Sequence, residues 1–103
     1  MSSYVTDIKK YTADVNESAV TAIASYCGIA LRNADASLVS ATDPKELATV
    51  RDGFAAKKLG LAPDAADAGI NAVVQKMKAT PQKHRVTFYY LLAEATNTLG
   101  KLN

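Results

Sequence analysis

The stretch from Arg85 to Ala95 constrains the fold more than any other part of the chain. No other window of the sequence is as apolar or as aromatic. A helix that is apolar on all sides is usually buried on all sides. We therefore predict a central helix, from about Pro81 to Leu99, against which the other helices pack. Its apolar residues are Val86, Phe88, Tyr89, Tyr90, Leu91, Leu92, Ala93 and Ala95.

The length and composition predict one domain over residues 1–103. Hydrophobic residues make up 49% of the 103 residues, and there are only 3 Pro and 5 Gly. A chain of this length buries roughly 60 to 70% of its unfolded surface. The one cysteine, Cys27, lies between Ile23 and Ile29 and cannot form an internal disulfide. We expect a small buried side chain there, and the absence of a disulfide framework indicates a reducing cytoplasm.

Two short helices are predicted in the first third of the chain. The first covers Tyr4 to about Ala13, where apolar residues recur at helical spacing. The second covers Glu17 to about Cys27, with Asn16 as a suitable N-cap. Gly28 can end this second helix in a left-handed cap. The helix can equally continue to Asn33, and the sequence leaves both alternatives open.

The third helix has the clearest start and stop in the sequence. Pro44 suits the first helical position, because its missing N–H costs nothing there. Asp43 and Glu46 have the spacing of a capping box, with Asp in place of Ser or Thr. Lys57 and Lys58 suit the negative end of the helix dipole, and Gly60 suits a left-handed cap after the last turn.

The fourth helix is predicted to begin at Asp64 as its N-cap. Gly69 lies inside it, where glycine either costs about 1 kcal/mol against alanine or permits a close crossing with another helix. The side chains expected to face the core are Ile70, Val73, Val74 and Met77.

These patterns together predict an all-α fold. We expect a compact bundle of five or six short helices around the apolar C-terminal helix, without strands. Leu38 and Val39 are expected to follow a short turn and to plug the core.

The sequence does not predict an enzyme. With one His and one Cys, a zinc site is nearly excluded, and no phosphate-binding glycine loop or calcium loop is present. His84 lies between Lys83 and Arg85, whose charges disfavour its protonated form, and we expect it to face solvent at the start of the last helix. We therefore predict no catalytic residue, no metal and no cofactor.

A basic segment at 76–85 is the main candidate for a binding site. Cations at the start of a helix reinforce its positive end, which attracts phosphate or carboxylate groups. The alternative is a solvated loop, or Arg85 paired internally with a carboxylate such as Asp52 or Glu94. The residues of this basic junction are Lys76, Lys78, Lys83, His84 and Arg85.

Tyr89 and Tyr90 raise the question of self-association. Adjacent positions on a helix point about 100° apart, so both rings cannot face the same centre. One ring could face a second subunit, with its hydroxyl at the rim, or both could serve the monomer's own core.

Three segments resemble a family of small bacterial proteins, the domain of unknown function 2853. They are Val50–Leu61, Arg85–Glu94, and Gly28–Arg32 followed by Asp35–Leu38. The resemblance covers nearly the whole chain and implies a bacterial, all-helical, single-domain protein. It implies no activity and carries over no functional residues.

The function expected from the sequence is therefore modest. The first residues do not form a signal peptide, and the longest uncharged run, the 14 residues of Ser18–Leu31, is shorter than the ~20 that span a bilayer. The net charge of +2 is too small to indicate a nucleic-acid partner. We expect a cytoplasmic protein-interaction or structural module, either a homo-oligomer or bound to another protein. The alternative is a phosphate- or nucleic-acid-binding protein that uses the basic junction at 76–85.

Overall fold

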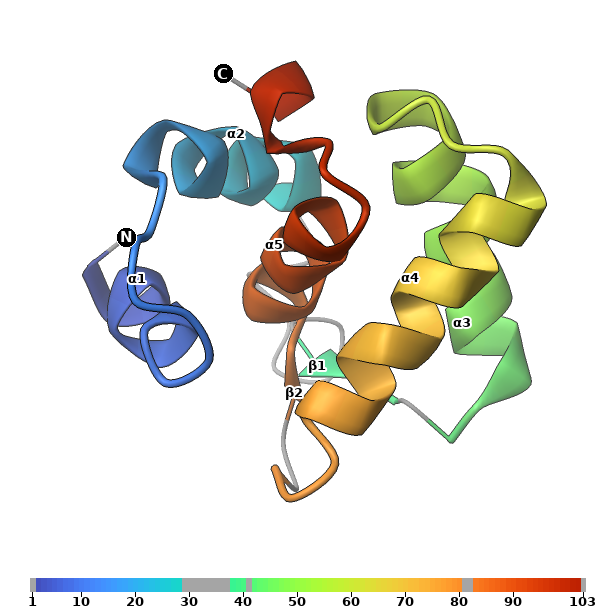
Figure 1. Ribbon diagram of the computed structural model, residues 1–103, viewed down its shortest axis with the longest axis horizontal. Helices are drawn as coiled ribbons and strands as arrows, with labels where there is room; N and C mark the ends of the chain where they lie inside the picture. The colour runs from blue at the N-terminus through green and yellow to red at the C-terminus, as the bar shows by residue number, and fades with distance from the viewer. Residues whose placement is uncertain (1, 29–37, 41, 81–82, 103) are drawn as a thin grey trace.

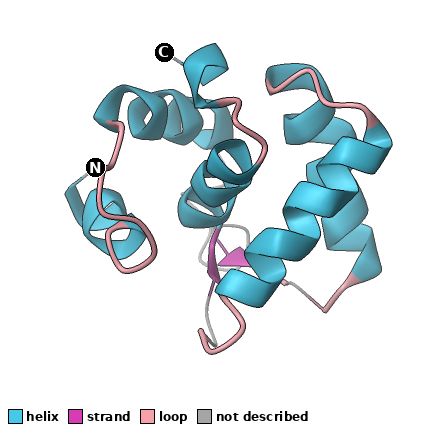
Figure 2. Ribbon diagram, in the orientation of Figure 1, coloured by secondary structure: helices cyan, strands magenta, loops and turns pink. Residues whose placement is uncertain are grey.

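The computed structural model describes residues 2–28, 38–40, 42–80 and 83–102, and over these residues the chain is predominantly helical (Figures 1 and 2). This confirms the predicted all-α class. A two-stranded antiparallel ladder was not predicted. In chain order the elements are α1 (Ser2–Ile8), α2 (Glu17–Cys27), β1 (Leu38–Val39), α3 (Pro44–Thr49), the π-helix η2 (Val50–Lys58), α4 (Pro63–Lys76), β2 (Lys83–His84), α5 (Arg85–Ala95) and the 3₁₀-helix η3 (Leu99–Leu102).

Helix α5 is the central helix, as predicted. All eight residues from Val86 to Ala93 are buried. Figure 1 shows α5 in the middle of the molecule, with α1 and α2 on one side and α4 on the other, and α5 packs against all three. The surrounding helices therefore contribute their apolar faces to one shared core.

The predicted ends of α5 were wrong. The helix begins at Arg85 rather than near Pro81, which lies outside the described residues, and it ends at Ala95 rather than Leu99. Before the helix, Lys83 and His84 are extended, because they pair with Val39 and Leu38 of β1. After it, Asn97 adopts a positive φ of 59°, which is incompatible with a continuing right-handed helix.

The first two helices differ in how well the sequence located them. Helix α1 ends at Ile8, several residues before the predicted Ala13. Helix α2 has the predicted bounds, and the side chain of Asn16 accepts a hydrogen bond from the Ala19 N–H at 3.2 Å. Gly28 follows it with a φ of 37°. The alternative continuation to Asn33 falls outside the described residues.

The third predicted helix begins and ends where expected but changes character midway. Asp43 caps it, since its carboxylate accepts from the Lys45 N–H at 2.9 Å. Gly60 ends it with a φ of 66°. The predicted α-helical geometry fails from Val50 onward, where the chain becomes π-helical. Buried Val50, Phe54 and Leu59 are spaced four and five residues apart, and this spacing fits the wider π turn better than an α turn.

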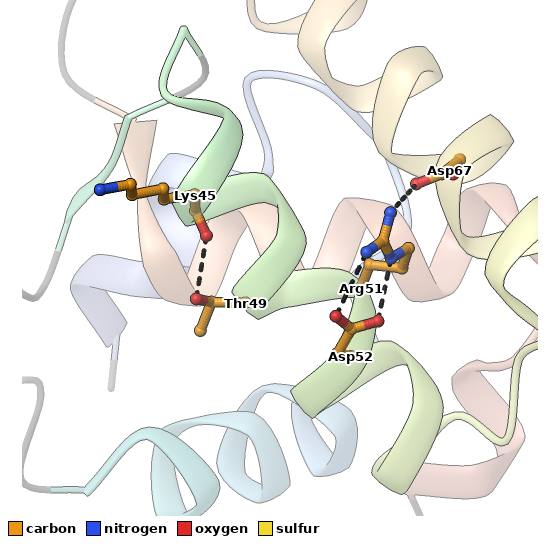
Figure 3. Close-up of polar contacts among 5 residues, drawn as sticks. All are labelled: Lys45, Thr49, Arg51, Asp52 and Asp67. Atoms are coloured by element: carbon orange, nitrogen blue, oxygen red, sulfur yellow. Dashed lines mark hydrogen bonds and ion pairs between the residues drawn. The ribbon is translucent and has the colours of Figure 1, made fainter.

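The transition into the π-helix lies beside two local contacts drawn in Figure 3. The hydroxyl of Thr49 donates to the carbonyl of Lys45 at 3.0 Å, a contact that competes with the helical ladder and bends helices. Arg51 pairs with neighbouring Asp52 at 2.9 Å and reaches Asp67 of α4 at 3.7 Å. The Arg51–Asp67 contact ties η2 to α4 on the surface.

Helix α4 begins two residues earlier than predicted, since a helix capped by Asp64 would begin at Ala65. Pro63 takes the first helical position and Ala62 is the N-cap without a side-chain bond, so the prediction that Asp64 caps this helix was wrong. Ile70, Val73 and Met77 are buried as predicted, and Val74 is half-buried. The predicted role of Leu38 and Val39 holds for Val39, which is buried, and partly for Leu38.

Gly69 permits a close crossing between α4 and α5, which decides between the two alternatives for this residue. A methyl group at Gly69 would lie 2.5 Å from Cγ2 of Thr96 and 2.8 Å from Cδ1 of Leu92. Thr96 cannot easily move away, because its hydroxyl donates to the Leu92 carbonyl at 2.9 Å.

We expect Gly69→Ala to destabilise the fold by about 1 to 3 kcal/mol, the usual cost of overpacking. This loss should outweigh the gain of about 1 kcal/mol in helix propensity. Urea denaturation measures the change. Gly100→Ala is the matched control, since nothing lies within 4 Å of a methyl group there. A Gly69→Ala variant more stable than the parent would contradict the close crossing.

Candidate functional site

Arg85 sits at the start of α5 and joins it to two other elements. Its guanidinium donates to the Leu38 carbonyl of β1 at 3.2 Å and to the Tyr89 hydroxyl at 2.9 Å. It also forms a hydrogen-bonded ion pair with Glu46 of α3. The side chain of Arg85 is only 12% exposed, and that of Glu46 is 23% exposed. The internal pairing considered for Arg85 is therefore present, with Glu46 as the carboxylate in place of Asp52 or Glu94.

The partner of Arg85 follows from the chain's path. Because β2 pairs with β1 immediately before α5, Arg85 lies beside Leu38 and near the first turn of α3, where Glu46 projects. Asp52 instead pairs with Arg51. Glu94, more than two helical turns further along α5, contacts Lys76 at 3.6 Å.

The environment of Arg85 shifts the pKa of several groups around it. Burial alone would lower the pKa of Arg85, yet Tyr89 and Glu46 stabilise the cation and the pKa is raised. Burial raises the pKa of Tyr89 above its ordinary value, against the opposing effect of Arg85. Arg85 and Tyr89 are therefore held in their cationic and neutral forms at neutral pH, which suits a structural hydrogen bond.

Cys27 is buried, as predicted, with 7% of its surface exposed. Burial raises the pKa of its thiol from 9.0 to about 11, although the nearby charge of Arg85 lowers it slightly. Because the thiolate is the nucleophile, a buried thiol with this pKa is poorly reactive at neutral pH.

The residues of the basic junction do not gather into one site, and most of them contact different partners. Lys76 pairs with Glu94, Arg85 pairs with Glu46, and the Lys83 ammonium donates to the Thr80 carbonyl at 2.7 Å. His84 is half-buried at the N-cap of α5, where we had expected a solvent-facing first-turn residue. Lys78 is exposed. Two of the four Lys and Arg residues of the junction, Lys76 and Arg85, are thus already paired with carboxylates.

Both tyrosines of the central helix serve the core of the monomer. Tyr89 and Tyr90 are both buried. The Tyr89 ring stacks on Phe54 with ring centroids 4.2 Å apart. The Tyr90 hydroxyl accepts from the Asn16 N–H at 2.8 Å. Of the two alternatives, the structure therefore bears out the one in which both rings serve the monomer's own core.

One aromatic ring of this cluster reaches the surface. Tyr26 packs against Phe54 and Tyr89, and it is 40% exposed, the one large hydrophobic side chain to be so exposed in the described part of the chain. The ammonium of Lys58 lies over its ring, 5.6 Å from the centroid. Tyr26 is thus already covered in part by its own chain.

A further apolar surface is a groove between α4 and the end of α5. Its volume is about 310 Å³. Three exposed alanines of α4 form one wall, and Ala95 and Thr96 form the other. We call this hollow the α4 groove, lined by Leu61, Ala65, Ala68, Gly69, Ala72, Ala95 and Thr96.

Our sequence reasoning missed the α4 groove. The pattern that could have revealed it is a second stripe of small apolar residues on the fourth helix, Ala65, Ala68 and Ala72, beside the stripe that enters the core. Alanine is common in helices because of its high helix propensity alone. The stripe therefore does not indicate a binding surface until it is known which face of the helix packs against the core.

The described residues form neither a metal-binding cluster nor a membrane-spanning helix. Within them, no three or more His, Cys, Asp or Glu side chains come together as a metal site would need. None of the helices described is both long and apolar enough to cross a bilayer.

We expect Glu46→Gln to destabilise the protein by about 1 to 3 kcal/mol, because it leaves a largely buried guanidinium without its carboxylate. Asp52→Asn is the matched control, since Asp52 is 64% exposed and pairs only at the surface; it should cost much less stability than Glu46→Gln, because solvent screens exposed ion pairs. Chemical denaturation of both variants provides the comparison. If both variants lose the same free energy of unfolding, the buried Arg85–Glu46 pair stabilises the fold no more than a surface ion pair does.

Comparison with known proteins places this chain in a family. A search of curated proteins found no match. The profile of a family described as "Protein of unknown function (DUF2853)" matches residues 3–100, nearly the full length. This agrees with the resemblance seen in Val50–Leu61 and Arg85–Glu94. The chain therefore belongs to the DUF2853 family of proteins of unknown function.

Proposed function

We propose that this protein is a protein-interaction module whose contact surface is the α4 groove. The observation that carries the proposal is the groove itself, an open apolar hollow of about 310 Å³ beside exposed alanines. Binding a partner removes apolar surface from water, and this lowers the free energy of the complex. We take the protein to act in the bacterial cytoplasm, as the family resemblance and the single cysteine suggest.

The shape of the groove suits a helix from a partner. Ala65, Ala68 and Ala72 have small side chains, and the distance between packed helices depends on the size of the side chains at their contact. A partner helix can therefore lie close to α4 and bury backbone as well as side-chain surface. The aromatic residues of α5 are already used in the monomer's core, so they offer a partner little.

The alternative function, anion binding at the basic junction, has less support. Arg85 and Lys76 already contact carboxylates, and Lys83 contacts a backbone carbonyl. An incoming phosphate would have to compete with the buried Arg85–Glu46 pair. Lys78 is the exposed cation of the junction that makes no such contact in the described part of the chain.

Photo-cross-linking tests the proposed function directly. We expect benzoylphenylalanine in place of Ala68 to form a discrete adduct on irradiation in extracts of the source organism, because a bound partner would cover that position. The same substitution at Ala56, which is exposed on η2, is the matched control and should form none. The proposal is wrong if Ala68 yields no adduct, or only the diffuse labelling that Ala56 yields.

A titration tests the alternative. We expect inorganic phosphate and single-stranded DNA to bind weakly, with an affinity that the Lys78→Ala, Lys83→Ala double substitution leaves unchanged. NMR chemical-shift changes measure this binding. Tight binding that weakens steeply with salt, and that the double substitution removes, would favour anion binding over our proposal.

A further inference from the structure

We propose that the occupant of the α4 groove is a second copy of this chain, docked so that the two α4 helices run antiparallel. This inference rests on the proposed function, because it names the partner of that same groove. It makes the protein a symmetric homodimer in which both copies use the same surface.

The exposed face of α4 has the residue spacing of a helix–helix seam. Ala65, Ala68, Ala72 and Gln75 are separated by three, four and three residues. This alternation of three and four is the spacing that coiled coils use at their contact positions. All four residues are exposed. The face is distinct from the buried stripe of Ile70, Val73 and Met77, which packs inside the monomer.

An antiparallel register brings small residues together along this seam. With Ala68 opposite the partner's Ala72, Ala65 lies opposite the partner's Gln75. A two-fold axis repeats each of these contacts once more, as self-complementary dimers require. Small residues on both sides let the two backbones approach closely. The wall formed by Ala95 and Thr96 flanks the same seam on the α5 side.

Charges at the two ends of α4 select the antiparallel direction. Asp64 lies in the first turn of α4 and Lys78 lies in the turn just after its last residue, Lys76, with Asn71 midway between them in the sequence. In the antiparallel register Asp64 lies beside the partner's Lys78, and Asn71 lies at the axis. A parallel register would instead place Asp64 beside the partner's Asp64, and like charges repel.

Both charged groups are available for a partner. Asp64 and Lys78 are exposed, and neither side chain makes an ion pair or hydrogen bond elsewhere in the described part of the chain. Other charges near α4 are already used, since Asp67 contacts Arg51 and Lys76 contacts Glu94. Antiparallel packing also places each positive helix end next to a negative one.

Charge reversal combined with measurement of solution mass tests this arrangement. We expect sedimentation equilibrium to show the parent protein passing from 10.9 kDa to twice that mass between micromolar and millimolar concentration. Asp64→Lys alone and Lys78→Asp alone should each raise the dissociation constant about tenfold, because each turns two attractive contacts into repulsive ones. The double variant restores both attractions and should return to within about threefold of the parent.

Controls separate this effect from loss of folding. Lys57→Asp makes the same charge change at the exposed end of η2 and should leave the mass unchanged. Thermal unfolding of each variant shows whether helix α4 is intact. If the Asp64→Lys or Lys78→Asp variant unfolds, the neutral variants Asp64→Asn and Lys78→Gln are measured instead. Each neutral variant should weaken the dimer by a smaller factor.

The outcomes distinguish this inference from the proposed function. If the parent protein stays monomeric throughout this concentration range, the inference that a second copy occupies the groove is wrong. An adduct of Ala68 with a different protein would then still support the groove as an interaction surface. A dimer that ignores both reversals, or a double variant no tighter than the singles, overturns the antiparallel register.

Discussion

The burial of α5 on all sides is the constraint on which the rest of this structure depends. Eight consecutive residues, from Val86 to Ala93, are withdrawn from water. A single neighbour can cover only one side of a helix, so several elements must surround it. Helices α1, α2 and α4 and the π-helix η2 all pack against α5. Their apolar stripes are buried in these contacts.

Polar side chains on α5 fix how each neighbour is placed around it. The Thr87 hydroxyl donates to Asp7 of α1 at 2.5 Å, and Tyr90 contacts the N–H of Asn16 before α2. Arg85 reaches Glu46 of α3. Buried polar groups without partners are costly, and each of these groups finds its partner on a different element. Hydrophobic burial thus brings the helices together, while these contacts set their registers.

The fold class and the central helix were predictable from sequence because both depend on local patterns. The starts at Asn16 and Asp43 and the stop at Gly60 follow from backbone groups within one turn of each residue. The start of α5 was missed because it depends on pairing between β1 and β2, which are more than forty residues apart. The π geometry of η2 was missed because helix patterns are read with an α-helical period.

The candidate site shows the same division between local and distant information. The internal pairing of Arg85 was foreseen as an alternative, but its partner Glu46 is 39 residues away and no local pattern identifies it. The groove was missed because exposed alanines look like ordinary helix formers until the covered face is known. With α5 enclosed, the surface beside Ala65, Ala68 and Ala72 remains open to a partner.

Native-state hydrogen exchange tests the central claim that α5 is the enclosed core of the fold. The amides from Phe88 to Leu92, placed inside the helix and fully surrounded, should exchange only through global unfolding, with the same free energy as chemical denaturation gives. Amides on the exposed side of α4 should exchange through smaller openings. If the α5 amides exchange at a lower free energy than those of α4, α5 is not the element on which the fold is built.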